Sequence, residues 1–234
     1  MRLRLHLDSD KMTGYLVTVK IASQNAVMSQ AKRKLKTKQY HHGDLRQALI
    51  AGALALIEEE GIAALSLREV ARRIGVSHAA PYHHFEDRSA LLCAVAEQGF
   101  VAMHEAMVQA VRVAGQSPIQ SLQAIGIAYV QFAAGNPSQF RVMFSPDVVG
   151  EKQNAALKSA SSATFQRLSE GLVAAGLSET KARDAALLAW STVHGSSMLW
   201  IDHQLTMPEA PPDVAAFAKK VVRMLTKSLK MSDL

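Results

Sequence analysis

The sequence predicts an all-α protein with a small N-terminal group of helices and a larger C-terminal helical bundle. Three observations favour this fold class. Apolar residues make up 49% of the 234 residues, but aromatic residues make up only 6%. Alanine and leucine, which favour helices over strands, are abundant. Apolar residues recur at spacings of three and four, and glycine and proline interrupt these runs.

The most informative segment covers residues 66–85, with the sequence SLREVARRIGVSHAAPYHHF. We expect a helix, a three-residue turn and a second helix. Ser66 and Glu69 have the spacing of a capping box, and Gly75 stands where a helix ends in the left-handed conformation. The apolar face of the first helix is formed by residues at helical spacing, namely Leu67, Val70, Ala71 and Ile74.

The second helix of this segment is short and polar, and we expect Ser77 to cap it. It contains no acidic residue. A short polar helix that is braced by an apolar partner helix is what a DNA major groove accepts. The segment therefore predicts a helix-turn-helix, and it favours a DNA-binding protein over an enzyme.

The other helices are predicted from apolar stripes and the breaks between them. One helix over residues 43–60 precedes the motif. A long helix follows, capped by Asp87 or Ser89 and reaching about residue 113. This helix is apolar on more than one side, so it should pack against two groups of helices, the N-terminal head and the C-terminal bundle. Later helices are expected at residues 119–134, 138–144, 150–175, 180–203 and 213–230.

Positive charge is concentrated next to the helix-turn-helix. The formal net charge is +6. Residues 32–46 contain six lysines or arginines and one acid, Asp44, whereas residues 89–234 contain twelve basic and eleven acidic residues. An isolated basic run is a solvated tail about as often as it is a nucleic-acid-binding segment. Beside a helix-turn-helix, the run indicates an arm that binds nucleic acid.

Other classes of protein find little support in the sequence. The single cysteine, Cys93, excludes an internal disulfide and fits a cytoplasmic protein. No apolar run approaches the roughly 20 residues of a membrane span. The histidines lack metal-ligand spacing, so we expect no metal and no cofactor. An enzyme that pairs His194 with Asp202 or His203 would lack a complete catalytic set.

Residues 40–100 resemble the DNA-binding domain of TetR/AcrR-type transcriptional regulators. The matching segments are HHGDLRQALIAGALALIEEEG, SLREVARRIGVSHAAPYHHF and EDRSALLCAVAEQGF. The segments NPSQFRVMFSP and AWSTVHG resemble a subgroup named for a Trp-His-Gly signature, here Trp190, His194 and Gly195. The resemblance implies a homodimer that binds a palindromic DNA operator, usually as a repressor, and that a small-molecule effector releases.

The organisation of the chain and the resemblance together predict how the chain is divided, although the resemblance does not cover residues 1–27. We expect residues 1–31 to be a disordered or non-native extension, since Met28 is a plausible native start. Residues 32–88 should form the helix-turn-helix DNA-binding domain with its basic arm. Residues 89–234 should form the helical ligand-binding and dimerisation domain.

The DNA-binding residues are carried over by position. Ser77, His78 and Ala79 open the recognition helix and should face base edges, where His78 can donate to guanine and Ala79 can contact a thymine methyl group. No arginine or lysine lies in this helix, so DNA shape should contribute to specificity. The expected phosphate contacts are Tyr40, His42, Ser66, Arg68, Tyr82 and His83.

The candidate walls of the ligand pocket lie on four helical segments, and ordinary core packing is the alternative for each residue. Methionines suit a partly apolar effector but also fill cores. His194 could orient a ligand or could be structural. The candidates are Met103, Met107, Tyr129, Phe132, Phe140, Met143, Phe144, Trp190, His194 and Met198.

A dimer surface is expected on the last two helices, over residues 182–204 and 213–229. Small residues there would allow two helices to approach closely: Ala185, Ala186, Ala189 and Gly195. The alternative function is a ligand-independent activator or an architectural DNA-binding protein. The helix-turn-helix is equally compatible with both functions, whereas a pocket in the C-terminal domain favours the ligand-responsive regulator.

Overall fold

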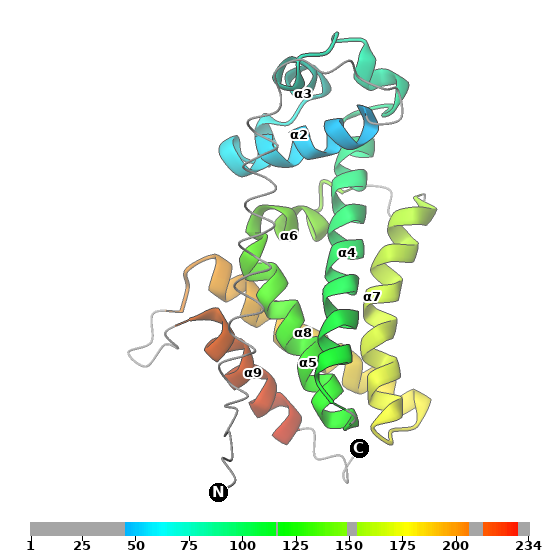
Figure 1. The fold of residues 1–234 in the computed structure, drawn as a ribbon, viewed down its shortest axis with the longest axis vertical. Coiled ribbons are helices and arrows are strands. Elements are labelled where there is room, and N and C mark those ends of the chain that lie inside the picture. Colours follow the sequence, from blue (N-terminus) through cyan, green and yellow to red (C-terminus); the bar gives the residue numbers. More distant parts are fainter. Residues whose placement is uncertain (1–44, 116, 149–153, 206–212, 229–234) are drawn as a thin grey trace, which may run out of the picture. The chain divides into compact units, whose positions relative to one another are not determined.

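The computed structural model describes residues 45–115, 117–148, 154–205 and 213–228, and every secondary-structure element in these ranges is a helix (Figure 1). Backbone contacts divide the chain into Met1–Leu45 and Arg46–Leu234. The predicted extension, the basic arm, Tyr40 and His42 lie outside the described residues. The predicted domain boundary at residue 88 falls inside the second unit and stays a prediction.

The head of the second unit is built from α2 (Leu45–Glu60), η1 (Ile62–Ala64), α3 (Leu67–Ile74) and η2 (Ala80–His83). Its core is apolar, with Leu49, Leu56 and Val70 fully buried. The helices α2 and α3 approach closely at Gly52, where an added Cβ would lie 2.7 Å from Cγ2 of Ile74. Any larger residue at this position would force the two helices apart.

Both predicted ends of α3 are confirmed. The Ser66 hydroxyl accepts the backbone N–H of Glu69 at 3.1 Å, and Gly75 adopts the left-handed conformation with φ of 76°. The reciprocal half of the predicted capping box is not formed. The Glu69 carboxylate instead accepts Nε of Arg72 at 2.9 Å, because the arginine one turn later offers a charged donor.

The second helix of the motif differs from the prediction. A turn that starts at Ser77 leads into the short 3₁₀ helix η2, whose N-cap is Ala79 and has no side-chain cap bond. Proline has no N–H, so Pro81 cannot form an α-helical bond to the Ser77 carbonyl. The N–H of Ala80 takes that carbonyl at 3.0 Å with 3₁₀ spacing. The predicted Ser77 side-chain cap is therefore wrong.

The long helix α4 (Arg88–Val113) begins as predicted at Asp87, whose carboxylate accepts the N–H of Ala90 at 2.8 Å. It runs from the head down between α5 (Pro118–Gly135) and α7 (Ala155–Ala174) (Figure 1). By length and composition alone it could cross a membrane, but 56% of its most apolar window is buried inside the protein. Burial against two neighbouring bodies accounts for its apolar surface.

The rest of the body consists of α6 (Pro137–Met143), α8 (Glu179–Ile201) and α9 (Val214–Ser228). The helix α6 packs against α4 and α5, α8 packs against α5 and α7, and α9 packs mainly against α5. These bounds confirm the predicted C-terminal helices to within a few residues where the chain is described. Asn136 and Pro137 separate α5 from α6, and the positive φ of Gly176 separates α7 from α8.

Three of the four small residues predicted for the dimer surface lie elsewhere, whereas Gly195 is partly exposed and an added Cβ there would meet open space. Ala185, Ala186 and Ala189 are buried inside the bundle, where α8 packs against α5 and α7. Small side chains allow that close approach within one chain. The exposed side of α8 carries larger residues instead: Leu187 is 55%, Leu188 54% and Leu199 47% exposed.

The two serines of the motif give a stability prediction. Ser66→Ala removes a cap bond and should lower the free energy of unfolding by about 1 kcal/mol. Ser77→Ala removes a hydroxyl that caps nothing and should leave it nearly unchanged. Urea denaturation of both variants without DNA measures the difference. Equal losses in the two variants would contradict the assignment of the cap.

Candidate nucleic-acid interface and internal cavity

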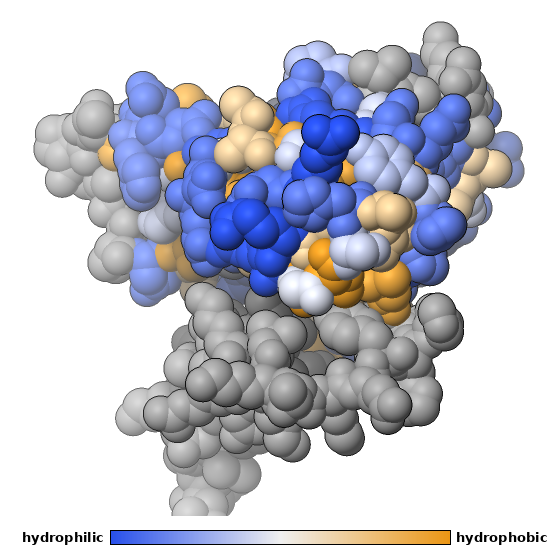
Figure 2. All heavy atoms as spheres, turned by 90° about the horizontal axis from the view of Figure 1, so that it is seen from above, coloured by the Kyte–Doolittle hydropathy of each residue, from blue (hydrophilic) through white to orange (hydrophobic). Residues whose placement is uncertain are grey.

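The predicted base-facing residues lie on the surface of the head. Ser77, His78 and Ala79 are exposed. Figure 2 shows the described part of the molecule from above, as a mainly hydrophilic face with scattered apolar patches. The neighbouring residues Pro81 and Phe85 are buried and anchor the segment from below. An exposed polar edge fixed by apolar anchors is suited to contact a groove.

The predicted phosphate contacts in the described residues are also exposed. They are Ser66, Arg68, Tyr82 and His83. Arg72 and Arg73 pair with Glu69 and Glu59, so their charges are largely offset within the head. Arg68 has no ion-pair partner in the described part of the chain. Its guanidinium is therefore the most available cation of α3 for a phosphate.

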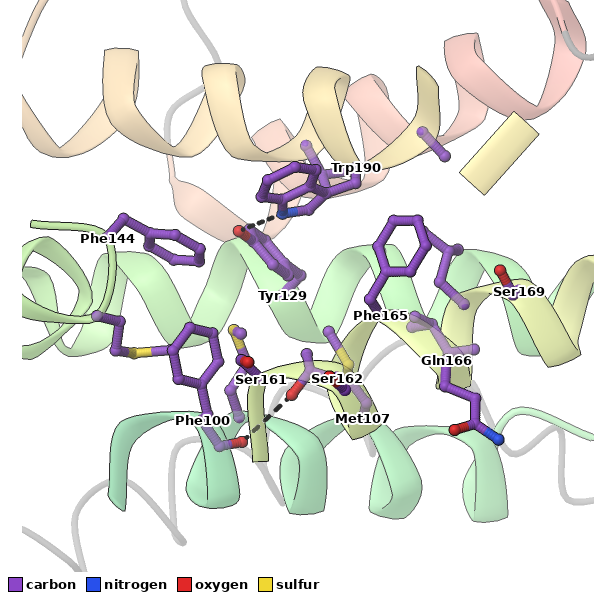
Figure 3. Close-up of a pocket in the computed structure, with 18 of the residues that line it drawn as sticks. Phe100, Met107, Tyr129, Phe144, Ser161, Ser162, Phe165, Gln166, Ser169 and Trp190 are labelled. Atoms are coloured by element: carbon purple, nitrogen blue, oxygen red, sulfur yellow. Dashed lines mark hydrogen bonds between the residues drawn. The ribbon is translucent and has the colours of Figure 1, made fainter. Parts of the chain in front are cut away.

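The C-terminal bundle contains a cavity of about 850 Å³, a size typical of small-molecule sites. Side chains from α4, α5, α7, α8 and α9 line it, together with the end of α6 and the segment that follows it (Figure 3). Six of the predicted wall residues lie on this cavity: Met103, Met107, Tyr129, Met143, Phe144 and Trp190.

The other four candidates do not line the cavity. Phe140 is fully buried behind the wall and packs edge-on against Tyr129, with ring centroids 5.6 Å apart. His194 lies behind Tyr129, to which it is hydrogen-bonded. The remaining two, Phe132 and Met198, are partly buried on other sides of α5 and α8.

The contribution of α7 to the cavity is missing from the prediction. This helix supplies a row of mostly polar residues, which in the sequence is typical of a solvated face. The aromatic ring of Phe165 in the middle of that polar row was the available signal. The residues of α7 on the cavity are Leu157, Ser161, Ser162, Thr164, Phe165, Gln166, Leu168, Ser169 and Leu172.

A chain of hydrogen bonds crosses the wall between α5 and α8. Nε1 of Trp190 donates to the Tyr129 hydroxyl at 3.2 Å, as Figure 3 shows, and that hydroxyl lies 2.9 Å from Nδ1 of His194. Burial lowers the pKa of the His194 imidazole and raises the pKa of the Tyr129 phenol. Both groups are therefore neutral at neutral pH.

The arrangement does not form the histidine–aspartate pair that an enzyme would use here. His194 is engaged with Tyr129, and Asp202 accepts Nη2 of Arg141 at 2.6 Å. Within the described ranges no three side chains of histidine, cysteine, aspartate or glutamate come together in a metal-binding group. The polar groups of the cavity wall are suited to binding rather than to acid–base chemistry.

Two family descriptions match the chain. "Bacterial regulatory proteins, tetR family" matches residues 49–95, and "Tetracyclin repressor-like, C-terminal domain" matches residues 122–225. The chain belongs to the TetR family. The predicted family and the all-α fold with its helix-turn-helix are thereby confirmed. As a member of this family the chain is a DNA-binding transcriptional regulator and not an enzyme, while the narrower Trp-His-Gly subgroup stays a prediction.

Individual relatives extend this picture. Over 59 residues the chain is 41% identical to the tetracycline repressor protein class C of Escherichia coli, a match that spans 25% of the chain but only 27% of that relative. A structure of unknown function from Rhodococcus sp. RHA1 is 32% identical, with a TM-score of 0.69 over 82% of this chain and 99% of its own. The TetR-family regulator PfmR of Thermus thermophilus, at 20% identity and a TM-score of 0.57, covers 78% of this chain and 98% of its own and shares the fold.

The lowered pKa of His194 predicts a pH-dependent stability. Because its pKa lies below the ordinary value of 6.5, the unfolded chain binds the proton more tightly. The contribution of the neutral His194 imidazole to the free energy of unfolding is complete above about pH 6.5. This contribution is lost as the pH falls toward the pKa of His194 in the folded protein. Between about pH 8 and about pH 5, the free energy of unfolding should fall more in the wild type than in His194→Gln. Equal falls would contradict the burial assignment.

Proposed function

We propose that this TetR-family regulator is a cytoplasmic repressor. It acts as a homodimer that binds a palindromic DNA operator through residues 66–85, and a small molecule in the cavity of the C-terminal bundle releases it. The observation that carries the proposal is that the cavity is lined by α4, whose first residue, Arg88, is hydrogen-bonded to the head.

The DNA contacts follow from exposure and chemistry. Ser77, His78 and Ala79 face base edges, and His78 donates to a guanine acceptor. Tyr82, His83, Ser66 and Arg68 bind phosphates and set the position of the head. The exposed polar segment and the available guanidinium of Arg68 support these roles. The further contacts Tyr40 and His42 rest on the family resemblance alone.

The homodimer is supported by the apolar residues on the exposed side of α8 and α9. Leu187, Leu188, Leu199 and Met224 are each about half exposed or more. Large apolar side chains exposed on neighbouring helices are suited to an interaction site. A two-fold pairing of these helices covers the same surface on both copies and places two recognition segments on successive turns of DNA.

Release by a ligand is supported by the packing of α6 on α4. Met143 lies on the cavity and presses against α4 at Gly99, where an added Cβ would be 2.6 Å from the Met143 sulfur. At the head end of α4, Arg88 donates to the carbonyls of Ile62 at 2.8 Å and Leu65 at 3.1 Å, directly before α3. A ligand that moves Met143 therefore shifts α4 and, with it, the recognition segment.

The energetic requirement of this mechanism is a difference in ligand affinity between two states of the protein. The ligand weakens DNA binding only by the factor with which it prefers the state that does not fit the operator. The alternative function, a ligand-independent activator or architectural protein, needs no cavity. The cavity lined by α4 favours the ligand-responsive repressor.

The proposal predicts that the purified protein selects an inverted repeat from a random pool of DNA duplexes. The two half-sites should lie about one helical turn apart, roughly 34 Å, because a symmetric dimer reads them. Sequencing of the retained DNA is the measurement. Weak retention without sequence preference would support the architectural protein instead.

Two single substitutions separate reading from positioning. His78→Ala should change the base preference at one position of each half-site, since a donor contact to a base is lost. Tyr82→Phe should weaken binding to all sequences alike and leave the preference unchanged. Binding to the selected duplex and to single-base variants, measured by fluorescence anisotropy, distinguishes the two. Unchanged base preference in His78→Ala would remove the direct-readout role.

A further inference from the structure

Among the described residues that line the cavity, Tyr129 and Thr164 carry the buried hydroxyls. They are 3% and 7% exposed. A hydroxyl has one proton and two lone pairs, so its bonds to the protein decide what it offers a ligand. The Thr164 hydroxyl donates its proton to the carbonyl of Ala160 at 3.0 Å. Thr164 therefore offers the cavity lone pairs.

The same holds for Tyr129. The indole N–H of Trp190 can only donate, so the Tyr129 oxygen is the acceptor of that bond. The phenol proton then has one buried acceptor within reach, Nδ1 of His194 at 2.9 Å. In the opposite arrangement, His194 would donate and the phenol proton would have no acceptor among the described protein groups, which is unfavourable in the ligand-free protein. The remaining lone pair of Tyr129 is what a ligand meets.

The cavity wall is also almost free of charge. Both His194 and Tyr129 are neutral, because burial lowers the pKa of the first and raises the pKa of the second. Of the described lining residues only Arg183 is charged, and it is exposed to solvent. It lies seven residues before Trp190 on α8, about 10 Å along the helix. A charged ligand group beside Tyr129 would lose its hydration without a counter-charge.

The apolar part of the cavity is long and partly aromatic. The α7 residues on the cavity extend about 22 Å along the helix axis, and the apolar ones among them are Leu157, Phe165, Leu168 and Leu172. Figure 3 shows the rings of Phe100, Phe144 and Phe165 arranged around the space below Trp190. Such walls accept an extended hydrocarbon or aromatic skeleton.

We propose that the effector is an uncharged, mostly apolar molecule that carries a hydroxyl or N–H group and donates it to Tyr129 or Thr164. This inference rests on the proposed function, because it names the ligand class of the cavity which that function requires. A ligand with only carbonyl or ether oxygens would have to reverse the Tyr129–His194 bond. A carboxylate would bring a charge that the inner wall does not compensate.

The test compares three probes that share one hydrocarbon chain: decanol, decyl methyl ether and decanoate. Each is titrated into the full-length protein at neutral pH, and binding is measured by calorimetry and by the change in tryptophan fluorescence, to which Trp190 on the cavity and Trp200 both contribute. Decanol should bind about fivefold to tenfold more tightly than the ether, the effect of one hydrogen bond. Decanoate should bind more weakly than decanol.

Two variants assign the acceptor, and a third is a matched control. Thr164→Val and Tyr129→Phe each remove a hydroxyl, so one of them should bring the affinity for decanol close to that for the ether and leave ether binding unchanged. Thr192→Val removes a threonine hydroxyl that also donates to a carbonyl four residues earlier but does not line the cavity. It should change neither affinity. Thr164→Val keeps the test valid if Tyr129→Phe does not fold.

Three outcomes would overturn the proposal. Equal binding of decanol and the ether would remove the donor requirement. If decanoate binds more tightly than the other two probes, and Arg183→Gln removes this preference, the effector is instead an amphipathic anion whose head group binds Arg183. Absence of binding by all three probes would exclude this ligand class. In each case sequence-specific DNA binding of the same preparation is measured separately, so that a failure of the proposed regulator is distinguished from a failure of its ligand class.

Discussion

The arrangement of the second unit depends on α4, which has to bury side chains in two places at once. Leu91, Leu92 and Val95 are fully buried toward the head, whereas Met103 and Met107 lie on the cavity. Gly99 separates the two groups, and there the Met143 side chain is so close that a Cβ has no room. A helix is stiff over this length, so the proposed release by a ligand depends on α4 carrying a displacement from the cavity to the head.

The connection at the head end consists of hydrogen bonds to the backbone rather than of ion pairs. Arg88 lies 3.7 Å from Asp147, but both side chains are more than a third exposed, and such pairs contribute little. Its two bonds to the carbonyls of Ile62 and Leu65 are partly buried and stand directly before the Ser66 cap of α3. The Arg88 guanidinium thus links the start of α4 to the backbone just before α3, through main-chain groups that few substitutions can alter.

The parts of this structure that depend on local chemistry could be predicted from the sequence. Ser66 and Gly75 delimit α3, and Asp87 begins α4, because caps act within one turn. The second helix of the motif was predicted, but not its 3₁₀ form, which follows from the missing N–H of Pro81. The faces of the later helices depend on tertiary partners. The polar row of α7 faces the cavity, and Ala185, Ala186 and Ala189 of α8 face the inside of the bundle. Periodicity shows that a helix has distinct faces, but it does not show whether a face contacts solvent, a cavity, another helix or a second copy of the chain.

The central claim is that occupation of the cavity and binding of DNA are coupled. The most direct measurement is a thermodynamic cycle with the wild-type protein, decanol and the DNA duplex recovered by selection. The affinity for the duplex is measured with and without saturating decanol, and the affinity for decanol with and without the duplex. The account predicts that each ligand weakens the other by the same factor, since coupling free energies are reciprocal. If decanol binds with an unchanged affinity for the duplex, the cavity is not a regulatory site.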